Sequence, residues 1–196
     1  MKEIIIIHGG DAYTSHEEYV EAIKSHPPRF KDGKQRWKSN LAAELEGLYT
    51  VHNPQFPSQD NAQFELWCIT FNKVLEQTGD DILLIGHSLG ANFLQSYLGR
   101  FKVAKNIHEI HFVSACVSEG NFYETENWTR ISQSSNSIHI WHSTDDPVVD
   151  YREGQYYHNK LPGSILRTLD DRKHFNQAYF PELSAHLINQ YYQPQN

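Results

Sequence analysis

The sequence predicts an α/β fold, in which a parallel sheet of about six strands carries helices on both faces as a three-layer sandwich. Short apolar runs rich in β-branched residues alternate with segments whose apolar residues recur at helical spacing, which is typical of βαβ units. Some of these runs are apolar at every position, as in strands buried on both faces of a parallel sheet. A chain of 196 residues suits one buried core and is too short for two ordinary domains, so we expect a single domain over residues 1–196.

The expected strands are short apolar runs, of which Ile4–Ile7 and Ile82–Ile85 contain no polar residue. Neither run shows helical spacing, and both have the length of a strand. The other runs are rich in β-branched residues. In chain order we expect strands at Glu3–Ile7, Leu48–His52, Asp81–Ile85, Ile107–Ser114, Ser137–His142 and Ser164–Leu169.

The expected helices fill the connections between these strands. After the third strand, Phe93, Leu94 and Tyr97 recur at the spacing of one helix face. After the first strand, two helical patterns are separated by His26-Pro27-Pro28. In chain order we expect helices near His16–Ser25, Arg36–Glu46, Ala62–Gln77, Leu89–Phe101, Arg152–Lys160 and Pro181–Tyr191.

A G-x-S-x-G motif, Gly86-His87-Ser88-Leu89-Gly90, joins the third strand to the following helix. A sharp strand-to-helix turn strains its middle residue, and the glycines remove β-carbons that would collide. We expect this turn to present an exposed Ser88 at a helix N-terminus. There the Leu89 N–H and the helix dipole can stabilise the negative charge that forms on a carbonyl oxygen during attack. The motif in this setting predicts a serine nucleophile.

A serine nucleophile needs a base and a carboxylate that orients the base. Asp145 and Asp146 follow the fifth strand, and His174 lies in a polar loop after the sixth. Catalytic groups of open α/β sheets collect at these carboxyl ends, and the order of acid then histidine suits a serine on this kind of sheet. Both aspartates are therefore candidates for the acid.

Together these motifs resemble the α/β-hydrolase superfamily, and most of all the compact retinoblastoma-binding-protein 9 and YdeN-like family of small serine hydrolases. The resemblance covers nearly the whole chain in element order. It implies a compact α/β-hydrolase fold with a nucleophile at Ser88, an acid at Asp146, a base at His174, and oxyanion donors at Leu89 and Gly10. It is carried by His8-Gly9-Gly10, Gly86-His87-Ser88-Leu89-Gly90, Ser143-Thr144-Asp145-Asp146-Pro147 and His174-Phe175.

The chain departs from that family at three places. Lys173 stands where glycine commonly precedes the histidine, which affects the turn and would disfavour the imidazolium if its amine pointed inward. The connection after the first strand is longer, at about forty residues. The L-x-C-x-E motif associated with retinoblastoma binding is absent, since Leu66–Thr70 ends in threonine. We therefore do not infer retinoblastoma binding from the resemblance.

A second long connection, residues 115–136, contains Phe122, Tyr123 and Trp128. It leaves the sheet on the side of the expected nucleophile, where a small cap or substrate wall could lie. The alternative is an ordinary surface loop whose aromatic side chains pack on the core. The sequence leaves the two open.

Composition excludes several other classes of function. A net charge of −7 argues against a nucleic-acid partner, and a basic cluster from Arg29 to Lys38 is interpreted as a solvated loop or helix face. No apolar run has the length of a signal peptide or membrane span, so we expect a cytoplasmic protein with no membrane partner. No phosphate-loop pattern follows Gly9-Gly10, and no cofactor is expected.

Twelve histidines suggest a metal site, but their spacing does not. His108 and His111, like His139 and His142, are three residues apart in expected strands and so face opposite sides of the sheet. We expect structural or surface histidines and no metal. His8 is expected to shape the oxyanion turn or to make a core hydrogen bond, and His87 to support the turn.

The sequence thus predicts a cofactor-independent serine hydrolase acting on a small-molecule acyl substrate, an ester or else an amide or thioester. An alternative is a protein-binding module that keeps the hydrolase fold with little or no catalytic activity. The sequence indicates no particular protein partner.

Overall fold

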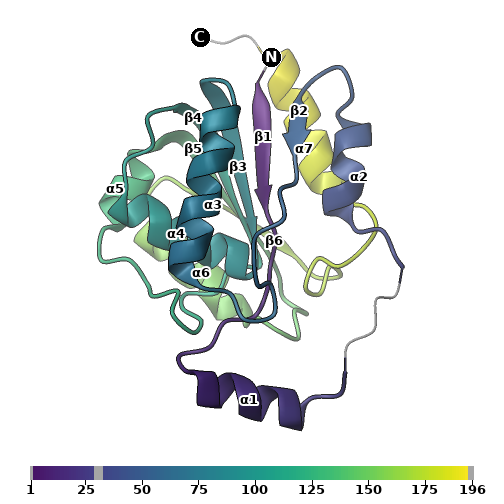
Figure 1. Ribbon diagram of the computed structural model, residues 1–196. Coiled ribbons are helices and arrows are strands. Elements are labelled where there is room, and N and C mark those ends of the chain that lie inside the picture. The colour runs from purple at the N-terminus through teal and green to yellow at the C-terminus, as the bar shows by residue number, and fades with distance from the viewer. Residues whose placement is uncertain (1, 29–32, 194–196) are drawn as a thin grey trace.

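The computed structural model describes residues 2–28 and 33–193 of the chain. The strands form one sheet in the order β2-β1-β3-β4-β5-β6, and every neighbouring pair is parallel (Figure 1). The predicted parallel sheet is confirmed. Because the chain passes from β1 outward to β2 and then back to β3, the strand order reverses between β1 and β3. The strands are β1 (Glu3–Ile7), β2 (Thr50–His52), β3 (Asp81–His87), β4 (Asn106–Val113), β5 (Ser135–Ser143) and β6 (Ile165–Leu169).

Helices cover both faces of the sheet, as predicted (Figure 1). Helices α3 to α6 contribute side chains to one apolar core, and α2 and α7 contribute to the other. None of the helices described for this chain has the length and apolar character that a membrane crossing requires. The helices are α1 (His16–Ser25), α2 (Trp37–Glu44), α3 (Phe64–Gln77), α4 (Leu89–Arg100), α5 (Trp128–Ser132), α6 (Tyr151–Lys160) and α7 (Pro181–Tyr192).

The uninterrupted apolar run of β1 follows from this three-layer arrangement. Ile5 and Ile7 belong to the core under α3 and α4, whereas Ile4 and Ile6 belong to the core under α2 and α7. Successive strand side chains point to opposite faces, and here both faces are buried. A polar residue at any of these positions would therefore lie in one core or the other.

Several element ends differ from the sequence prediction by one or two residues, and one helix was not expected. Strand β2 begins at Thr50 because the N–H groups of Leu48 and Tyr49 donate to the Leu45 carbonyl, in the turn that ends α2. Helix α5 lies inside the long connection of residues 115–136, where no helix was expected. With five residues it is too short to show a helical period, and the Asn127 side chain caps it by accepting from Arg130 N–H at 3.0 Å.

The connection of residues 115–136 packs mainly on the α4 side of the sheet. Phe122 and Trp128 are buried in that core, while Tyr123 is exposed. Gln95 of α4 fixes the backbone, since its amide donates to the Tyr123 carbonyl and accepts from the Thr125 N–H. Two of its aromatic rings are thus core packing, and a role for the segment as a substrate wall stays a prediction.

Helix α1 lies beyond the end of the sheet at which β1 finishes, apart from the two helical layers (Figure 1). It has no buried residue. Ser15 caps its N-terminus by accepting from Glu18 N–H at 3.1 Å, and the Tyr19 hydroxyl donates to Asp60 at 3.1 Å. The long connection after β1 therefore places a helix beyond the edge where the predicted site residues collect.

Candidate active site

Ser88 occupies a strained turn between β3 and α4, with φ 55° and ψ −124°. Residues other than glycine rarely adopt this backbone conformation, which costs about 1–3 kcal/mol and persists only where the surroundings impose it. Here the Ser88 N–H donates to the Val113 carbonyl of β4 at 2.9 Å. Ser88 is 7% exposed, less than the sequence suggested, because Gly9 of the β1 turn lies against it.

The two motif glycines are required by close backbone approaches. A β-carbon at position 86 would lie 2.6 Å from the Ala91 α-carbon, and one at position 90 would lie 2.3 Å from the Ile7 carbonyl oxygen. Both contacts are with backbone atoms, which cannot move aside as a flexible side chain can. The turn is thus wedged between its own helix and the end of β1.

His174 and Asp146 form a hydrogen-bonded pair. His174 Nδ1 lies 3.0 Å from Asp146 Oδ2 and 3.2 Å from Oδ1. The carboxylate also accepts from the Ser114 hydroxyl at 2.6 Å and from the N–H groups of Val148 and Val149 at 2.8 and 3.1 Å. Burial alone would raise the pKa of Asp146, but these donors outweigh it and hold the pKa below its ordinary value. A carboxylate kept ionised in this way fixes the proton of His174 on Nδ1 and leaves Nε2 as the basic atom.

The neighbouring aspartate has a different contact set. Asp145 is exposed, and its Oδ1 accepts from the Ser143 hydroxyl at 2.5 Å and from the Lys173 N–H at 2.9 Å. It therefore holds the backbone of the loop that carries His174, whereas Asp146 contacts the imidazole itself.

Ser88 and His174 are joined through His87. The described residues include no hydrogen bond between the Ser88 hydroxyl and the His174 ring; instead His87 Nε2–H donates to the His174 carbonyl at 2.9 Å. The two imidazoles lie with ring centroids 5.0 Å apart. Contacts between a nucleophile and its base are often loose in structures without substrate and tighten when substrate binds. The structure thus fastens the loop of His174 to the residue beside Ser88, the predicted nucleophile.

Lys38 fixes the tautomer of His87. Its Nζ lies 3.1 Å from His87 Nδ1, and because an ammonium can only donate, Nδ1 accepts and the His87 proton resides on Nε2. Burial and the Lys38 charge hold the pKa of His87 well below its ordinary value, so this ring is neutral. The interpretation of Lys38 as part of a solvated face is wrong, because Lys38 packs against the turn of Ser88. Of the other basic residues in that stretch, Lys34 is exposed, whereas Arg29 and Lys31 lie outside the described residues.

The turn after β1 is held in one orientation by side chains. The Gly9 carbonyl accepts from His8 Nδ1 at 2.7 Å and from Gln59 Nε2 at 3.0 Å. His8 Nε2 accepts from the Phe56 N–H at 2.9 Å, so the His8 proton is on Nδ1. Because the peptide bond is planar and trans, fixing the Gly9 carbonyl also fixes the Gly10 N–H, which points the opposite way.

These contacts bring two candidate oxyanion donors to one edge of the sheet. Leu89 is the first residue of α4, so its N–H has no acceptor within the helix. Gly9, one residue before Gly10, lies so close to the turn that a β-carbon on it would be 3.1 Å from the Ser88 β-carbon. Since β1 and β3 are adjacent and the strand order reverses between them, both turns open into the crevice where ligands of open α/β sheets bind.

Lys173 occupies a position that favours glycine, with φ of 47°. The left-handed conformation strains a lysine, and the Asp145 contact to its N–H holds it in place. Its side chain is exposed, so its amine does not point inward toward the imidazole. This departure from the family pattern leaves the turn before His174 intact.

Sequence reasoning missed three supporting residues. Ser114 follows β4 and donates to Asp146, Gln59 donates to Gly9, and Lys38 donates to His87. Each comes from an element distant in sequence from its partner, and none lies in a motif. The left-handed φ of Ser114, 44°, is visible only in the structure.

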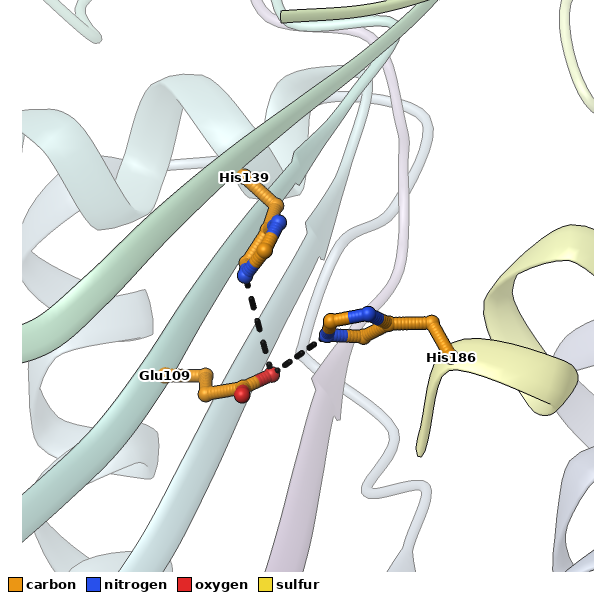
Figure 2. Close-up of side chains that lie close together, drawn as sticks. All are labelled: Glu109, His139 and His186. Carbon is orange, nitrogen blue, oxygen red and sulfur yellow. Dashed lines mark hydrogen bonds and ion pairs between the residues drawn. The ribbon is translucent and has the colours of Figure 1, made fainter. Parts of the chain in front are cut away.

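A second polar cluster lies on the α7 face of the sheet. Atoms of the kind that bind metal ions, a carboxylate oxygen and two imidazole nitrogens, lie within 4.8 Å of one another in this cluster. They belong to Glu109, His139 and His186 (Figure 2). Glu109 Oε2 lies 2.9 Å from His186 Nε2, 2.9 Å from His111 Nε2 and 3.9 Å from His139 Nε2. The sequence argument compared histidines within single strands, and it missed this cluster, which forms across β4, β5 and α7.

Hydrogen-bond directions in this cluster favour a hydrogen-bonded network around Glu109 over a metal centre. Arg167 donates to the Nδ1 atoms of His139 and His186 at 3.3 Å each. Their protons therefore reside on Nε2 and point toward Glu109, where a bound metal would need the Nε2 lone pairs. Burial acts to raise the pKa of Glu109, but the surrounding histidines lower it well below its ordinary value.

Comparison with known proteins gives consistent matches. A family model described as "Serine hydrolase" matches residues 29–182. The serine hydrolase RBBP9 of Rattus norvegicus is 26% identical over 136 residues, which cover 65% of this chain and 70% of that protein. The structure of the ydeN gene product of B. subtilis aligns with TM-score 0.78 at 16% identity, over 98% of this chain and 99% of that one. Est1E from Butyrivibrio proteoclasticus, solved with ferulic acid, aligns with TM-score 0.64 at 12% identity, over 97% and 88%.

Proposed function

The chain belongs to the serine hydrolase family, and on that premise we propose that it cleaves a small carboxylic ester through an acyl-enzyme. Ser88 is the nucleophile, His174 the base and Asp146 the orienting acid. The observation that carries the proposal is the His174–Asp146 pair at 3.0 Å, fastened by His87 to the turn of Ser88.

The acylation step uses the basic atom that Asp146 leaves on His174. Ser88 Oγ attacks the ester carbonyl while His174 Nε2 takes the hydroxyl proton, and Asp146 stabilises the imidazolium that forms. The carbonyl π electrons move to its oxygen, and the N–H groups of Leu89 and Gly10 donate to that oxyanion. As the tetrahedral intermediate collapses, the C–O bond to the alcohol breaks and His174 returns the proton to the leaving alkoxide.

Deacylation repeats the same steps with water. His174 removes a proton from a water molecule that attacks the acyl carbonyl, and the same donors hold the second oxyanion. Collapse releases the carboxylic acid and returns the proton to Ser88 Oγ. No redox step or external cofactor is needed in this sequence.

An ester is the preferred substrate class because its alcohol is a better leaving group than the amine of an amide. Proteins described as esterases also occur among the fold neighbours, including the esterase domain of a Rhodothermus marinus protein and RhEst1 from Rhodococcus sp.. The same three residues would also cleave a thioester, or an amide more slowly. Turnover assays with an ester, a thioester and an amide of the same acyl group would therefore identify the preferred bond.

A chain-length series of p-nitrophenyl esters tests the proposal. We expect turnover in the wild type and its loss in Ser88→Ala, with kcat reduced by at least about a thousandfold in His174→Ala. Asp146→Asn should cause a comparable loss, because the amide favours the wrong imidazole tautomer. Asp145→Asn is the matched control and should stay within about tenfold of the wild type. Turnover that survives in Ser88→Ala, or an Asp145 variant worse than the Asp146 variant, would overturn the assignment.

A further inference from the structure

Lys38 is a cation held against the turn that carries Ser88. It lies on α2, its Nζ donates to His87 Nδ1 at 3.1 Å, and the same nitrogen lies 5.1 Å from the ring centroid of Trp37. Most surface lysines keep the ammonium in water, but this one is directed into the site. It was counted in the sequence with a basic cluster and does not belong to a solvated face.

The ammonium has no anionic partner among the residues that the structure describes. Its hydrogen-bond partner, His87, is neutral, and the ion pairs of residues 2–28 and 33–193 do not include Lys38. Removing a charge from water without a counter-charge is costly, so sites of this kind are normally completed by an opposite charge. An ammonium has three donors, and His87 takes one of them.

The Lys38 ammonium lies close to the residues that the proposed reaction uses. His87 immediately precedes Ser88, and a β-carbon on Gly9 would lie 3.5 Å from His87 Nδ1, the atom that Lys38 contacts. Lys38 therefore lies beside both the nucleophile turn and the turn that carries the Gly10 N–H. A group bound by its free donors would be attached to a substrate whose carbonyl is at Ser88.

We propose that Lys38 binds a carboxylate group of the substrate, so that this hydrolase prefers esters that carry a negative charge close to the scissile bond. This inference rests on the proposed function and narrows its substrate class. The carboxylate could belong to the acyl part or to the alcohol part, and the test includes a substrate pair for each.

The pKa of Lys38 gives the preference a pH dependence. Burial, with a smaller contribution from Arg36, lowers the pKa of Lys38 to about 8. The other titratable groups facing it are His87 at the end of β3 and His8 after β1, and burial lowers the pKa of both. Lys38 loses its charge as the pH rises through about 8, so the preference for charged esters should decline between pH 7 and pH 9.

Two matched ester pairs measure the preference. The first is p-nitrophenyl hydrogen adipate against p-nitrophenyl methyl adipate, with the charge on the acyl part. The second is 4-acetoxybenzoate against methyl 4-acetoxybenzoate, with the charge on the alcohol part. The readout is the ratio of kcat/KM for the charged ester to that for the neutral ester. Because Lys38 also contacts His87, its loss should lower both rates, and only a role in recognition changes the ratio.

We expect the wild-type ratio in one pair to exceed about tenfold, as for a hydrogen bond to a charged group. It should fall to about one in Lys38→Met, recover in part in Lys38→Arg, and stay at the wild-type value in Lys102→Met, which removes an exposed lysine of the same charge. A wild-type ratio near one in both pairs, or a ratio unchanged in Lys38→Met, would overturn the inference.

A binding measurement separates this inference from the proposed reaction. In Ser88→Ala, calorimetry with p-nitrophenyl hydrogen adipate and with its methyl ester compares the charged and neutral ligands without turnover. Tighter binding of the charged ligand that disappears in Ser88→Ala/Lys38→Met supports the inference even if the wild type does not hydrolyse either ester. Equal binding of both ligands contradicts it even if Ser88 proves to be the nucleophile.

Discussion

Ser114→Ala should destabilise the protein by removing one donor from a fully buried carboxylate. Asp146 has no exposed side-chain surface, and the Ser114 hydroxyl donates to its Oδ2 at 2.6 Å. A hydrogen bond to a charged group contributes about 1.5–3 kcal/mol, and burial keeps water from replacing it. We therefore expect a loss of about 1.5–3 kcal/mol in the free energy of unfolding, or about 3–12 °C in Tm for a chain of this size.

The destabilisation caused by Ser114→Ala should also depend on pH, in a direction set by the pKa of Asp146. The folded pKa of Asp146 is lowered, so its contribution to stability is present above the unfolded pKa and is lost as the pH falls through the folded pKa. Removing the Ser114 donor should bring the folded pKa back toward its ordinary value. The stability difference between wild type and variant should thus be largest near neutral pH and shrink as the pH approaches 3.

Urea unfolding at pH 7 and in acid, followed by circular dichroism, measures both quantities. Ser184→Ala is the control, because among the described residues its buried hydroxyl hydrogen-bonds to the Phe180 and Pro181 carbonyls alone, at 3.4 and 3.3 Å. That change should cost less than about 0.5 kcal/mol. If Ser114→Ala costs no more than the control, or costs the same at both pH values, the Ser114 hydroxyl does not stabilise the ionised Asp146.

Three further changes have expected outcomes. Gly90→Ala should prevent folding or abolish ester turnover, because its β-carbon would lie 2.3 Å from the Ile7 carbonyl; a variant with wild-type Tm and activity would show that the turn can move. Lys173→Gly should leave turnover unchanged and raise stability by up to about 1 kcal/mol by relieving the strain at φ 47°, which a drop in Tm would contradict. Burial, with charge repulsion from neighbouring histidines, lowers the pKa of His139 to about 3, so the unfolded chain binds more protons below pH 6.5 and stability falls with acid. His139→Gln should remove about 2 kcal/mol of the stability lost between pH 7 and pH 5, and an unchanged slope would contradict the neutral state of this ring.

The sheet could be predicted because each strand carries its own signal. Ile4–Ile7 is apolar at every position, and the structure buries alternate residues in the two cores. Helix α5 has no such signal, since five residues are too few for apolar residues to recur at helical spacing. Its position follows from tertiary packing of Trp128 and Ile131, which no local pattern contains.

The site was partly predictable, because a motif indicates which residues come together in the site. It does not indicate which other residues hold them in position. The G-x-S-x-G pattern indicates the strained turn, since only glycine fits at positions 86 and 90. Two adjacent aspartates cannot be distinguished by residue type, and it is the direction of the turn that places Asp146 on His174 and Asp145 on the Lys173 backbone.

Contacts between distant elements set the remaining features. Lys38 lies in a basic stretch that is typical of a solvated helix, yet the packing of α2 brings it to His87. The cluster around Glu109 likewise joins β4, β5 and α7, so a search for spacing within one strand cannot find it. Polar side chains at element junctions depend on tertiary geometry that composition and periodicity do not encode.

The central claim is that Ser88 is an activated nucleophile, and covalent labelling tests it most directly. The folded protein is treated with a fluorophosphonate, digested, and the modified peptide is sequenced by tandem mass spectrometry. We predict one phosphonyl group on Ser88, none in Ser88→Ala, and labelling slowed by at least about a thousandfold in His174→Ala. A folded wild-type protein that stays unmodified, or a label that remains after Ser88 is replaced, would contradict the account.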